Sequence, residues 1–328
     1  MITVVGSLVM DLTVQVPHLV QPGGVVHGHA LQVACGGRGA NQACAVARMG
    51  AQATLIGMVG ADLFGDAMLA ALAKDGVDTC CVWRSDGGSS GCFVVAADPR
   101  GQTEIIVANG INGSLSRGQV ESHAALIAAS QALITQLETS YESAETALRL
   151  AHAAGVLTIL NAAPTFRFQT SVLPWCDIVC VNEPEAADIA GSPVHDVEGA
   201  ARAAAAIRRL GAGSVIVTLG AQGAWVDSQQ WQGHVAGYTV EVVDTLGAGD
   251  TFAGALAVRL CEGAELRAAV EFATAAAAIA VTRRGAQPSI PSRAEVEEFY
   301  QTARKPADHP EPVEGDRLVS KQQRGEGK

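Results

Sequence analysis

Short apolar runs, each bounded by glycine or polar residues, alternate along the chain with segments of helical periodicity. Runs of about four to eight apolar residues are typical of strands buried on both faces. We expect such strands over residues 2–5, 53–59, 132–134, 156–160, 178–181 and 215–219. We expect helices over residues 41–49, 64–74, 143–153, 185–190 and 197–210. This alternation predicts an α/β fold, with a doubly wound, mainly parallel sheet and helices on both faces.

Two segments, 12–33 and 91–107, interrupt this rhythm with strand-like alternation and no helix. Within the second, residues 92–96 and 103–107 flank the turn sequence DPRG, which predicts a hairpin. The two segments are expected to pair into a small sheet over about 12–35 and 91–108, placed as a lid on the main domain. An extension of the main sheet is the alternative.

The chain changes character at residue 304, where prolines and charges replace apolar residues. This composition predicts one domain over 1–303 and a disordered tail over 304–328. The first residues resemble a strand rather than a signal peptide, and the most apolar helical stretch, 273–281, is far short of the roughly 20 residues of a membrane span. We therefore expect a soluble, cytoplasmic protein without a membrane partner.

The charge balance excludes one class of function. Lys and Arg total 22 and Asp and Glu total 33, giving a formal net charge of −11. A nucleic-acid binder needs basic clusters to neutralise phosphates, so we expect no nucleic-acid partner.

The densest chemical signal is DTLGAGDTF at 244–252, followed by an apolar helical run at 253–260. Glycines at a helix start leave backbone N–H groups directed at one point, and the helix dipole adds positive charge, which together suit a phosphoryl group. Asp250 is placed to take a proton from an attacking hydroxyl. The alternative is that Asp250 only caps the helix. Neither GxxxxGK[ST] nor a complete GxGxxG after a strand occurs.

Two further segments carry candidate chemistry. In GGRGANQA at 36–43, the glycines permit close approach of a ligand, and Asn41 both donates and accepts, which suits a sugar hydroxyl. A plain glycine-rich helix start is the alternative. In NEPE at 182–185, Asn182 and Glu185 follow a predicted strand, where their oxygens suit Mg²⁺. Glu185 as a first-turn helix charge is the alternative there.

In their order along the chain, these three segments resemble the PfkB (ribokinase-like) family of carbohydrate kinases, most closely its ribokinase branch. The resemblance covers about residues 2–300. Four more segments resemble the family: QLE at 136–138, NAAP at 161–164, TLG at 218–220 and AVTRRGAQPS at 280–289. The resemblance implies ATP-dependent transfer of the γ-phosphoryl group to the 5-hydroxyl of a pentose, from D-ribose and ATP to ribose 5-phosphate and ADP.

The resemblance also implies roles for individual residues. Asp250 would be the base, and Gly247, Ala248 and Gly249 would supply N–H groups to the phosphoryl group. The sugar would lie against Val9, Met10, Asp11, Gly37, Arg38, Asn41, Glu138 and Asp250. The nucleotide and Mg²⁺ would be held by Asn182, Glu185, Thr218, Gly220, Gly223, Gly249 and Thr274. A monovalent cation, usually K⁺, would be held at Asp244, Leu246, Ala280, Arg283, Gly285 and Ser289, largely through carbonyl oxygens. Family members commonly form homodimers through their lids.

Two positions depart from the family members that act on ribose. Val9 stands where they carry Asn, and it cannot hydrogen-bond a sugar hydroxyl; Arg38 stands where they carry Lys. A 2-deoxyribose kinase, or a PfkB-type kinase of a ketose, sugar acid or nucleoside, therefore remains an alternative. A sugar-sensing protein without catalysis on the same fold is a further alternative, against which the intact Asp250 and glycine turn argue.

Overall fold

The computed structural model describes residues 1–100 and 102–303, and the predicted tail at 304–328 lies outside the described residues. Its main element is a nine-stranded sheet in the order β13-β12-β11-β10-β9-β8-β1-β4-β5. Neighbouring strands from β11 to β5 run parallel, whereas β12 and β13 are antiparallel additions at one edge. The strands are β1 (Ile2–Val5), β4 (Ala53–Gly60), β5 (Val82–Ser85), β8 (Ala132–Thr135), β9 (Leu157–Asn161), β10 (Ile178–Asn182), β11 (Ser214–Thr218), β12 (Ala224–Asp227) and β13 (Gln232–Val235).

All six predicted strands are confirmed. The three that were not predicted, β5, β12 and β13, lie at the two edges of the sheet. Edge strands carry exposed positions, as Trp83 and Arg84 do in β5, so they lack the continuous apolar run that marks a central strand.

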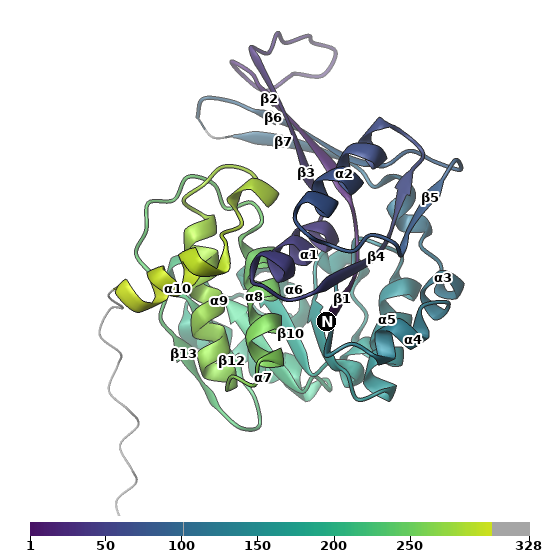
Figure 1. Ribbon diagram of the computed structural model, residues 1–328. Helices are drawn as coiled ribbons and strands as arrows, with labels where there is room; N and C mark the ends of the chain where they lie inside the picture. Colours follow the sequence, from purple (N-terminus) through teal and green to yellow (C-terminus); the bar gives the residue numbers. More distant parts are fainter. Residues whose placement is uncertain (101, 304–328) are drawn as a thin grey trace, which may run out of the picture.

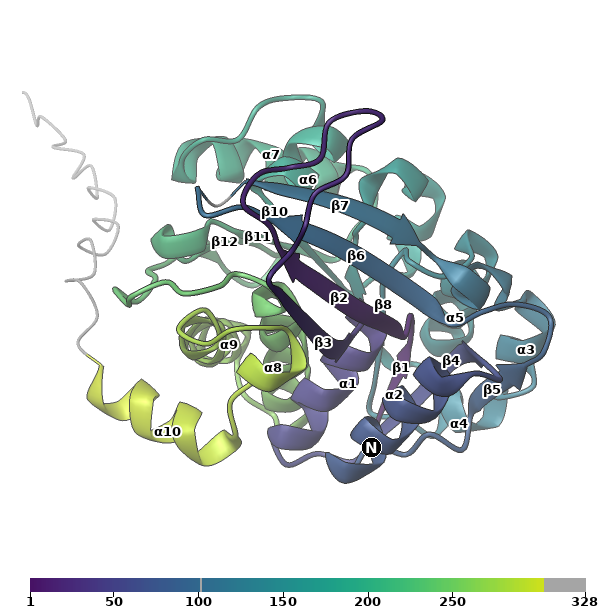
Figure 2. The ribbon, with the colours of Figure 1, turned by 90° about the horizontal axis from the view of Figure 1, so that it is seen from above.

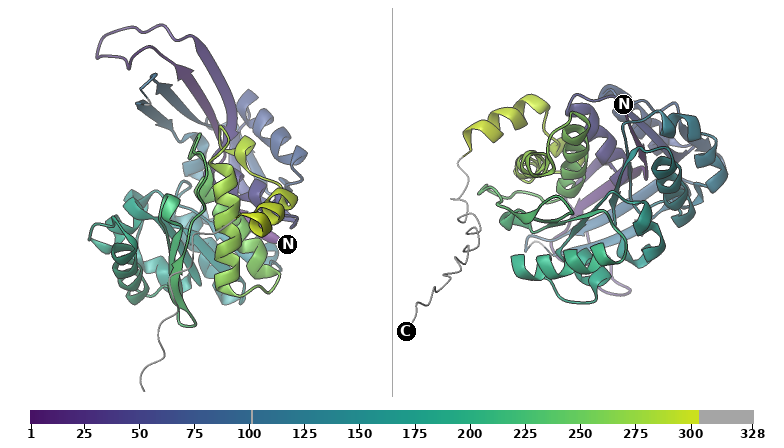
Figure 3. Two further views of the ribbon diagram at one scale, coloured as in Figure 1. Left: turned by 90° about the vertical axis from the view of Figure 1, so that its left-hand side faces the viewer. Right: turned by 90° about the horizontal axis from the view of Figure 1, so that it is seen from below.

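Helices cover both faces of the sheet, as predicted (Figures 2 and 3). Side chains of α1, α2, α8, α9 and α10 share one core with Ile2 and Val4 of β1, whereas those of α3 to α7 share the other with Val5. The helices are α1 (Arg38–Arg48), α2 (Leu63–Lys74), α3 (Arg117–Glu121), α4 (Ala124–Ala128), α5 (Tyr141–Ala153), α6 (Glu183–Ala190), α7 (Val197–Arg209), α8 (Ala248–Cys261), α9 (Leu266–Ala280) and α10 (Arg293–Thr302). Short 3-10 turns are η1 (Gly110–Ser114), η2 (Thr165–Arg167), η3 (Thr170–Trp175), η4 (Gly220–Gln222) and η5 (Gln287–Ser289).

The two segments without helices form a separate four-stranded sheet in the order β3-β2-β6-β7. Its strands are β2 (Val9–Gln15), β3 (Ala30–Gly36), β6 (Gly91–Ala97) and β7 (Thr103–Ala108). The sheet projects above the main domain (Figure 1), so the alternative of a simple extension of the main sheet is wrong. Among the described residues, no helix is long and apolar enough to cross a membrane.

The order of connections makes β1 a switch point, above which a crevice is expected. The chain leaves β1 for the small sheet and returns to β4 on one side, while β8 later pairs on the other side. In open α/β sheets, ligands bind outside the carboxyl ends of the strands at such a switch point. The carboxyl edge next to β1, under the small sheet, is therefore where a site is expected.

Candidate functional site

Polar side chains gather at this carboxyl edge because each follows or ends a parallel strand. Ser7 follows β1, Glu138 follows β8, and Asn161, Asn182 and Thr218 end β9, β10 and β11. The remaining functional side chains come from the first turns of α1 and α8, which pack against each other.

The start of α8 is built by Gly247, whose φ of 77° is the left-handed conformation that favours glycine. A Cβ here would approach the Cα of Ala286 to 3.0 Å, so the turn is packed tightly against the chain at 286. The Thr251 N–H donates to Gly247 O (2.8 Å), and the Ala248 N–H donates to Thr245 O (3.3 Å). The first turn of α8 then presents Gly249 and Asp250 toward the crevice.

Asp250 is 5% exposed, and two amides of α1 hold its carboxylate. Asn41 Nδ2 donates to Oδ2 (2.8 Å) and Gln42 Nε2 donates to Oδ1 (2.9 Å). Burial raises the pKa of Asp250 to about 6, although Arg38 and the two amides lower it, while Glu138 raises it. The group is thus a carboxylate at neutral pH that takes up a proton more readily than an exposed aspartate does.

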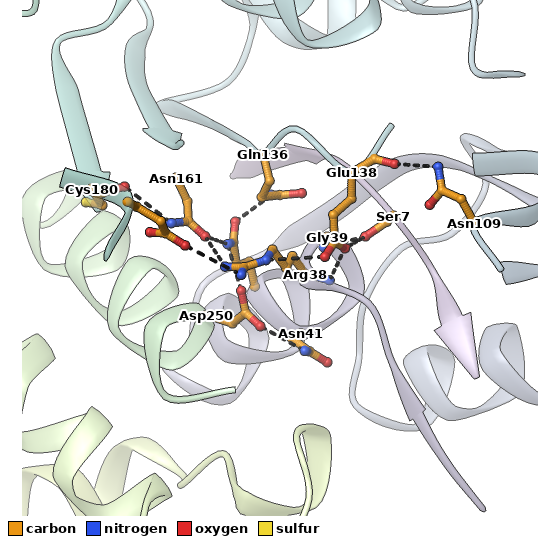
Figure 4. A network of polar contacts seen from close by, with 12 residues as sticks. Ser7, Arg38, Gly39, Asn41, Asn109, Gln136, Glu138, Asn161, Cys180 and Asp250 are labelled. Carbon is orange, nitrogen blue, oxygen red and sulfur yellow. Dashed lines mark hydrogen bonds and ion pairs between the residues drawn. The ribbon is translucent and has the colours of Figure 1, made fainter. Parts of the chain in front are cut away.

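Arg38 lies at the centre of the polar network shown in Figure 4. Its Nε is 3.3 Å from Glu138 Oε1, its Nη2 is 3.7 Å from Glu185 Oε1, and its Nη1 donates to Asn161 Oδ1 (3.2 Å). Burial opposes the charge of Arg38, but the carboxylates of Asp250, Glu138 and Glu185 raise its pKa. One guanidinium therefore joins the strand ends of β8, β9 and β10.

Asp11 of β2 brings the small sheet to this network. Burial, and after it the nearby carboxylates of Glu138 and Asp250, raise the pKa of Asp11 to about 7. Val9 shares the face of Asp11, because alternate strand residues point the same way, and it is fully buried. The Met10 side chain points the other way, into the core shared by α1, α2, α8, α9 and α10. Only the backbone of Met10 lies on the side of Asp11.

Two buried acceptor atoms of the network have no hydrogen-bond partner among the described residues: Asn41 Oδ1 and Gln136 Oε1. Buried polar atoms are nearly always paired, so the unpaired Asn41 Oδ1 beside Asp250 fits a ligand that carries a hydroxyl donor. Gln136 Oε1 instead packs against the backbone of Gly6. Gly37 begins α1 at a φ of 90°, next to the backbone of Val9, and completes this side of the crevice.

A cavity of about 280 Å³ lies on the other side of the α8 N-terminus. It is mainly apolar, with Phe252, Val240 and Val281 in its wall. Five of the seven positions predicted to hold the nucleotide line it: Thr218, Gly220, Gly223, Gly249 and Thr274. The cavity and the polar network therefore meet at Gly249 and Asp250.

Asn182 and Glu185 stand apart from this cavity and form the N-terminal cap of α6. Asn182 Oδ1 accepts from the Glu185 N–H and Glu185 Oε2 accepts from the Asn182 N–H, each at 2.9 Å. Burial raises the pKa of Glu185, while the Asn182 N–H and Arg38 lower it. The alternative, Glu185 as a first-turn helix charge, describes this side chain, while Asn182 is the N-cap and Glu185 Oε1 faces Arg38.

Of the six positions predicted for a monovalent cation, Asp244 joins two others, Leu246 and Gly285. Its Oδ1 accepts from the Leu246 N–H (3.0 Å) and its Oδ2 accepts from the Gly285 N–H (2.9 Å). The guanidinium of Arg283 instead pairs with Glu295 (2.6 Å), which leaves its carbonyl for such a role. The remaining predicted positions are Ala280, whose carbonyl accepts from the Arg283 N–H (3.1 Å), and Ser289. In the described part of the chain, no cluster of three or more His, Cys, Asp or Glu could hold a metal.

Four side chains of the network were given no role from the sequence: Ser7, Gln42, Gln136 and Asn161. Ser7 Oγ donates to Glu138 Oε2 (2.5 Å), and Gln42 Nε2 donates to both Asn161 (3.1 Å) and Asp250. Gln136 Nε2 donates to Gln42 Oε1 (2.5 Å). The available signal was position alone, since three of them follow or end predicted strands.

Comparison with known proteins agrees with this geometry. A family model for pfkB family carbohydrate kinases matches residues 1–293. Ribokinase of Haemophilus influenzae is 37% identical over 302 residues, covering 92% of this chain and 99% of that protein. Deoxyribokinase of Salmonella typhi is 31% identical over 301 residues, covering 92% and 97%. The structure of Arabidopsis thaliana ribokinase complexed with ribose and ATP has a TM-score of 0.86 at 29% identity, covering 92% of this chain and 99% of that one. The chain belongs to the pfkB family of carbohydrate kinases.

Proposed function

We propose that the protein transfers the γ-phosphoryl group of ATP to the 5-hydroxyl of D-ribose. One observation carries this proposal: the buried carboxylate of Asp250 lies between a polar network with an unpaired acceptor and an apolar cavity. The likeness to ribokinases over nearly the whole chain supports the choice of sugar.

The sugar would occupy the polar side. Asp11 and Glu138 are acceptors for its hydroxyl groups, as is the unpaired Oδ1 of Asn41. The 5-hydroxyl would donate to Asp250, whose raised pKa suits proton uptake as the oxygen attacks. The small sheet, acting as a lid, would exclude water that otherwise competes as the acceptor.

The nucleotide would occupy the cavity, with its phosphates at the first turn of α8. Backbone N–H groups and the helix dipole there oppose the negative charge of the transferring group. Glu185 Oε1, which faces Arg38 but takes no part in the helix cap, is the carboxylate oxygen for Mg²⁺, held through water and the phosphates of ATP.

A monovalent cation such as K⁺ fits the loop around Asp244, because the site offers one carboxylate and carbonyl oxygens rather than soft ligands. When bound, it would add positive charge and stiffness beside the anion-binding turn. Exposed apolar side chains on the small sheet, including Leu31, Val33, Ile105 and Ile106, support a homodimer formed through the lids.

The assay that tests this proposal measures ADP release with ribose, 2-deoxyribose, fructose, sugar acids and nucleosides. Each sugar is tested with KCl and with choline chloride, and with Mg²⁺ and with EDTA. We expect ribose to be phosphorylated fastest, with Mg²⁺ required and K⁺ stimulating. Activity on none of the acceptors would refute the kinase, and a preference for fructose or a nucleoside would refute the pentose.

2-Deoxyribose is the second candidate, because the buried Val9 offers no polar atom on the sugar side. If Val9 contacts the 2-position, Val9→Asn should raise the ratio of kcat/KM for ribose over 2-deoxyribose by about tenfold, roughly one hydrogen bond. Val14→Asn, the same change farther along β2, should leave the ratio unchanged. An unchanged ratio in Val9→Asn as well would show that Val9 does not read this position.

The amide of Gln42 should set the pH at which the base works. Since its hydrogen bond lowers the pKa of Asp250, Gln42→Leu should move the acidic limb of the kcat profile above its starting value near pH 6, by about one pH unit. The sign follows because Asp250 must be deprotonated to act as the base. Profiles of kcat from pH 5 to 9 measure this. Gln136→Leu, which touches Gln42 but not Asp250, should shift the limb less; equal shifts would refute the assignment.

A further inference from the structure

Arg48, at the C-terminal end of α1, makes an unusually complete set of contacts outside the polar network. Its Nη1 donates to two backbone carbonyls, those of Gln287 (2.6 Å) and Ile290 (2.8 Å). Its Nε and Nη2 donate to both carboxylate oxygens of Asp75, at 2.9 to 3.1 Å. The guanidinium therefore joins α1, the C-cap of α2 and the 3-10 turn η5.

The segment that Arg48 holds is the long connection from α9 to α10. Between Ala280 and Arg293 it contains only η5, so its position depends on contacts with the rest of the domain. Ser289 closes the turn by bonding to Ala286 O through both its N–H (3.2 Å) and its hydroxyl (2.7 Å). Fixing the carbonyls of Gln287 and Ile290 thus also fixes Ala286.

Ala286 packs directly against Gly247 at the start of α8. It lies so close to Gly247 that a Cβ on Gly247 would come within 3.0 Å of its Cα. Asp244 also accepts from the Gly285 N–H, which joins the loop before α8 to the loop that contains Ala286. A chain of direct contacts leads from Arg48 through η5 and Ala286 to the turn that presents Gly249 and Asp250.

We propose that Arg48 is a positioning residue for phosphoryl transfer, which holds the 285–290 loop against Gly247 and so sets the anion-binding first turn of α8. The inference rests on the proposed role of that turn. A lysine cannot replace the arginine, because one ammonium group cannot span two carbonyls and both oxygens of a carboxylate.

The test compares Arg48→Met and Arg48→Lys with Arg208→Met. Arg208 is a matched control, since it also joins a carboxylate, Asp227 (3.1 Å), to a backbone carbonyl, Gly213 O (3.2 Å), on the opposite face of the sheet. We expect kcat of Arg48→Met to fall by about 10- to 100-fold, the scale of a misplacement near 1 Å, with KM for ribose within about threefold. Arg208→Met should lose thermal stability but keep kcat within about twofold.

A second measurement does not depend on turnover. ADP and adenosine share the cavity, but only ADP places phosphates at the first turn of α8. Arg48→Met should therefore weaken ADP binding and leave adenosine binding unchanged in calorimetry. Added guanidinium should restore part of kcat in Arg48→Ala. If the arginine variants do not fold, Asp75→Asn replaces them, because it removes the carboxylate that holds Arg48.

The proposal is overturned if folded Arg48→Met or Asp75→Asn keeps wild-type kcat and ADP affinity, or if Arg208→Met loses as much kcat. A wild-type protein that phosphorylates no sugar refutes the proposed function alone, because the ADP-to-adenosine comparison still tests Arg48.

Discussion

Asp250→Asn is expected to lower kcat by about 100-fold or more and, at pH 7, to make the folded protein more stable. The first effect follows because Asn cannot accept the proton of the sugar hydroxyl. The second follows because burial raises the pKa of Asp250 to about 6, so keeping it ionised at pH 7 costs folding free energy. A rise from 3.8 to about 6 corresponds to roughly 3 kcal/mol.

The asparagine should keep its hydrogen bonds to both amides of α1, with one buried Asn41 N–H taking the place of the unpaired Oδ1. Asn41 Oδ1 has no partner among the described residues, and rotation of that amide lets it accept from the new Nδ2. The gain in stability should depend on pH with a defined sign. A carboxyl whose pKa is raised in the folded state costs nothing below about pH 4, and the full cost is reached above about pH 6.

Thermal unfolding of both proteins at pH 4, 5, 6 and 7.5 measures this, together with kcat for ribose. Asp62→Asn should give the opposite sign: burial opposes its charge, but its bonds to Ser90 and Gly65 lower its pKa, so it should be less stable at pH 7. Near-normal turnover in Asp250→Asn would refute its role as base, and a loss of stability at pH 7 would refute the cost of its burial.

The parts of the site that the sequence predicts are those with a local signature. The glycine turn at 244–252 and the segment at 36–43 each contain a helix start that only glycine permits, at Gly247 and Gly37. Long apolar runs likewise predict the central strands, because burial on both faces leaves no polar positions.

What the sequence does not predict arises from packing between distant segments. Gln42 and Asn161 are 119 positions apart, and their amides carry no titratable group, so nothing local marks them. The same holds for Arg48 and Gln287, 239 positions apart. In contrast, the start of α10 does carry a local signal, the capping box of Ser292 and Glu295.

Arg38→Met should reduce stability and move the working pH range of the enzyme upward. The side chain lies among the carboxylates of Glu138, Glu185 and Asp250 and is a third exposed, so its loss should cost near the lower end of the 3–5 kcal/mol typical of breaking a buried ion pair. Because Arg38 is the largest factor that lowers the pKa of Asp250, the acidic limb of kcat should shift above pH 6.

The pH dependence of stability separates this charge effect from lost packing. Without Arg38, the raised pKa values of Asp250 and Glu185 rise further, so the stability deficit of Arg38→Met should be largest above pH 7 and narrow toward pH 4. Arg38→Lys keeps the charge but cannot reach Glu138, Glu185 and Asn161 at once, so it should shift the acidic limb less than Arg38→Met does while still lowering kcat. Unfolding curves from pH 4 to 8 and kcat profiles of both variants measure these effects, with Arg208→Met as the control for a lost surface arginine. An acidic limb that stays at its wild-type position in Arg38→Met would show that this guanidinium does not tune the base.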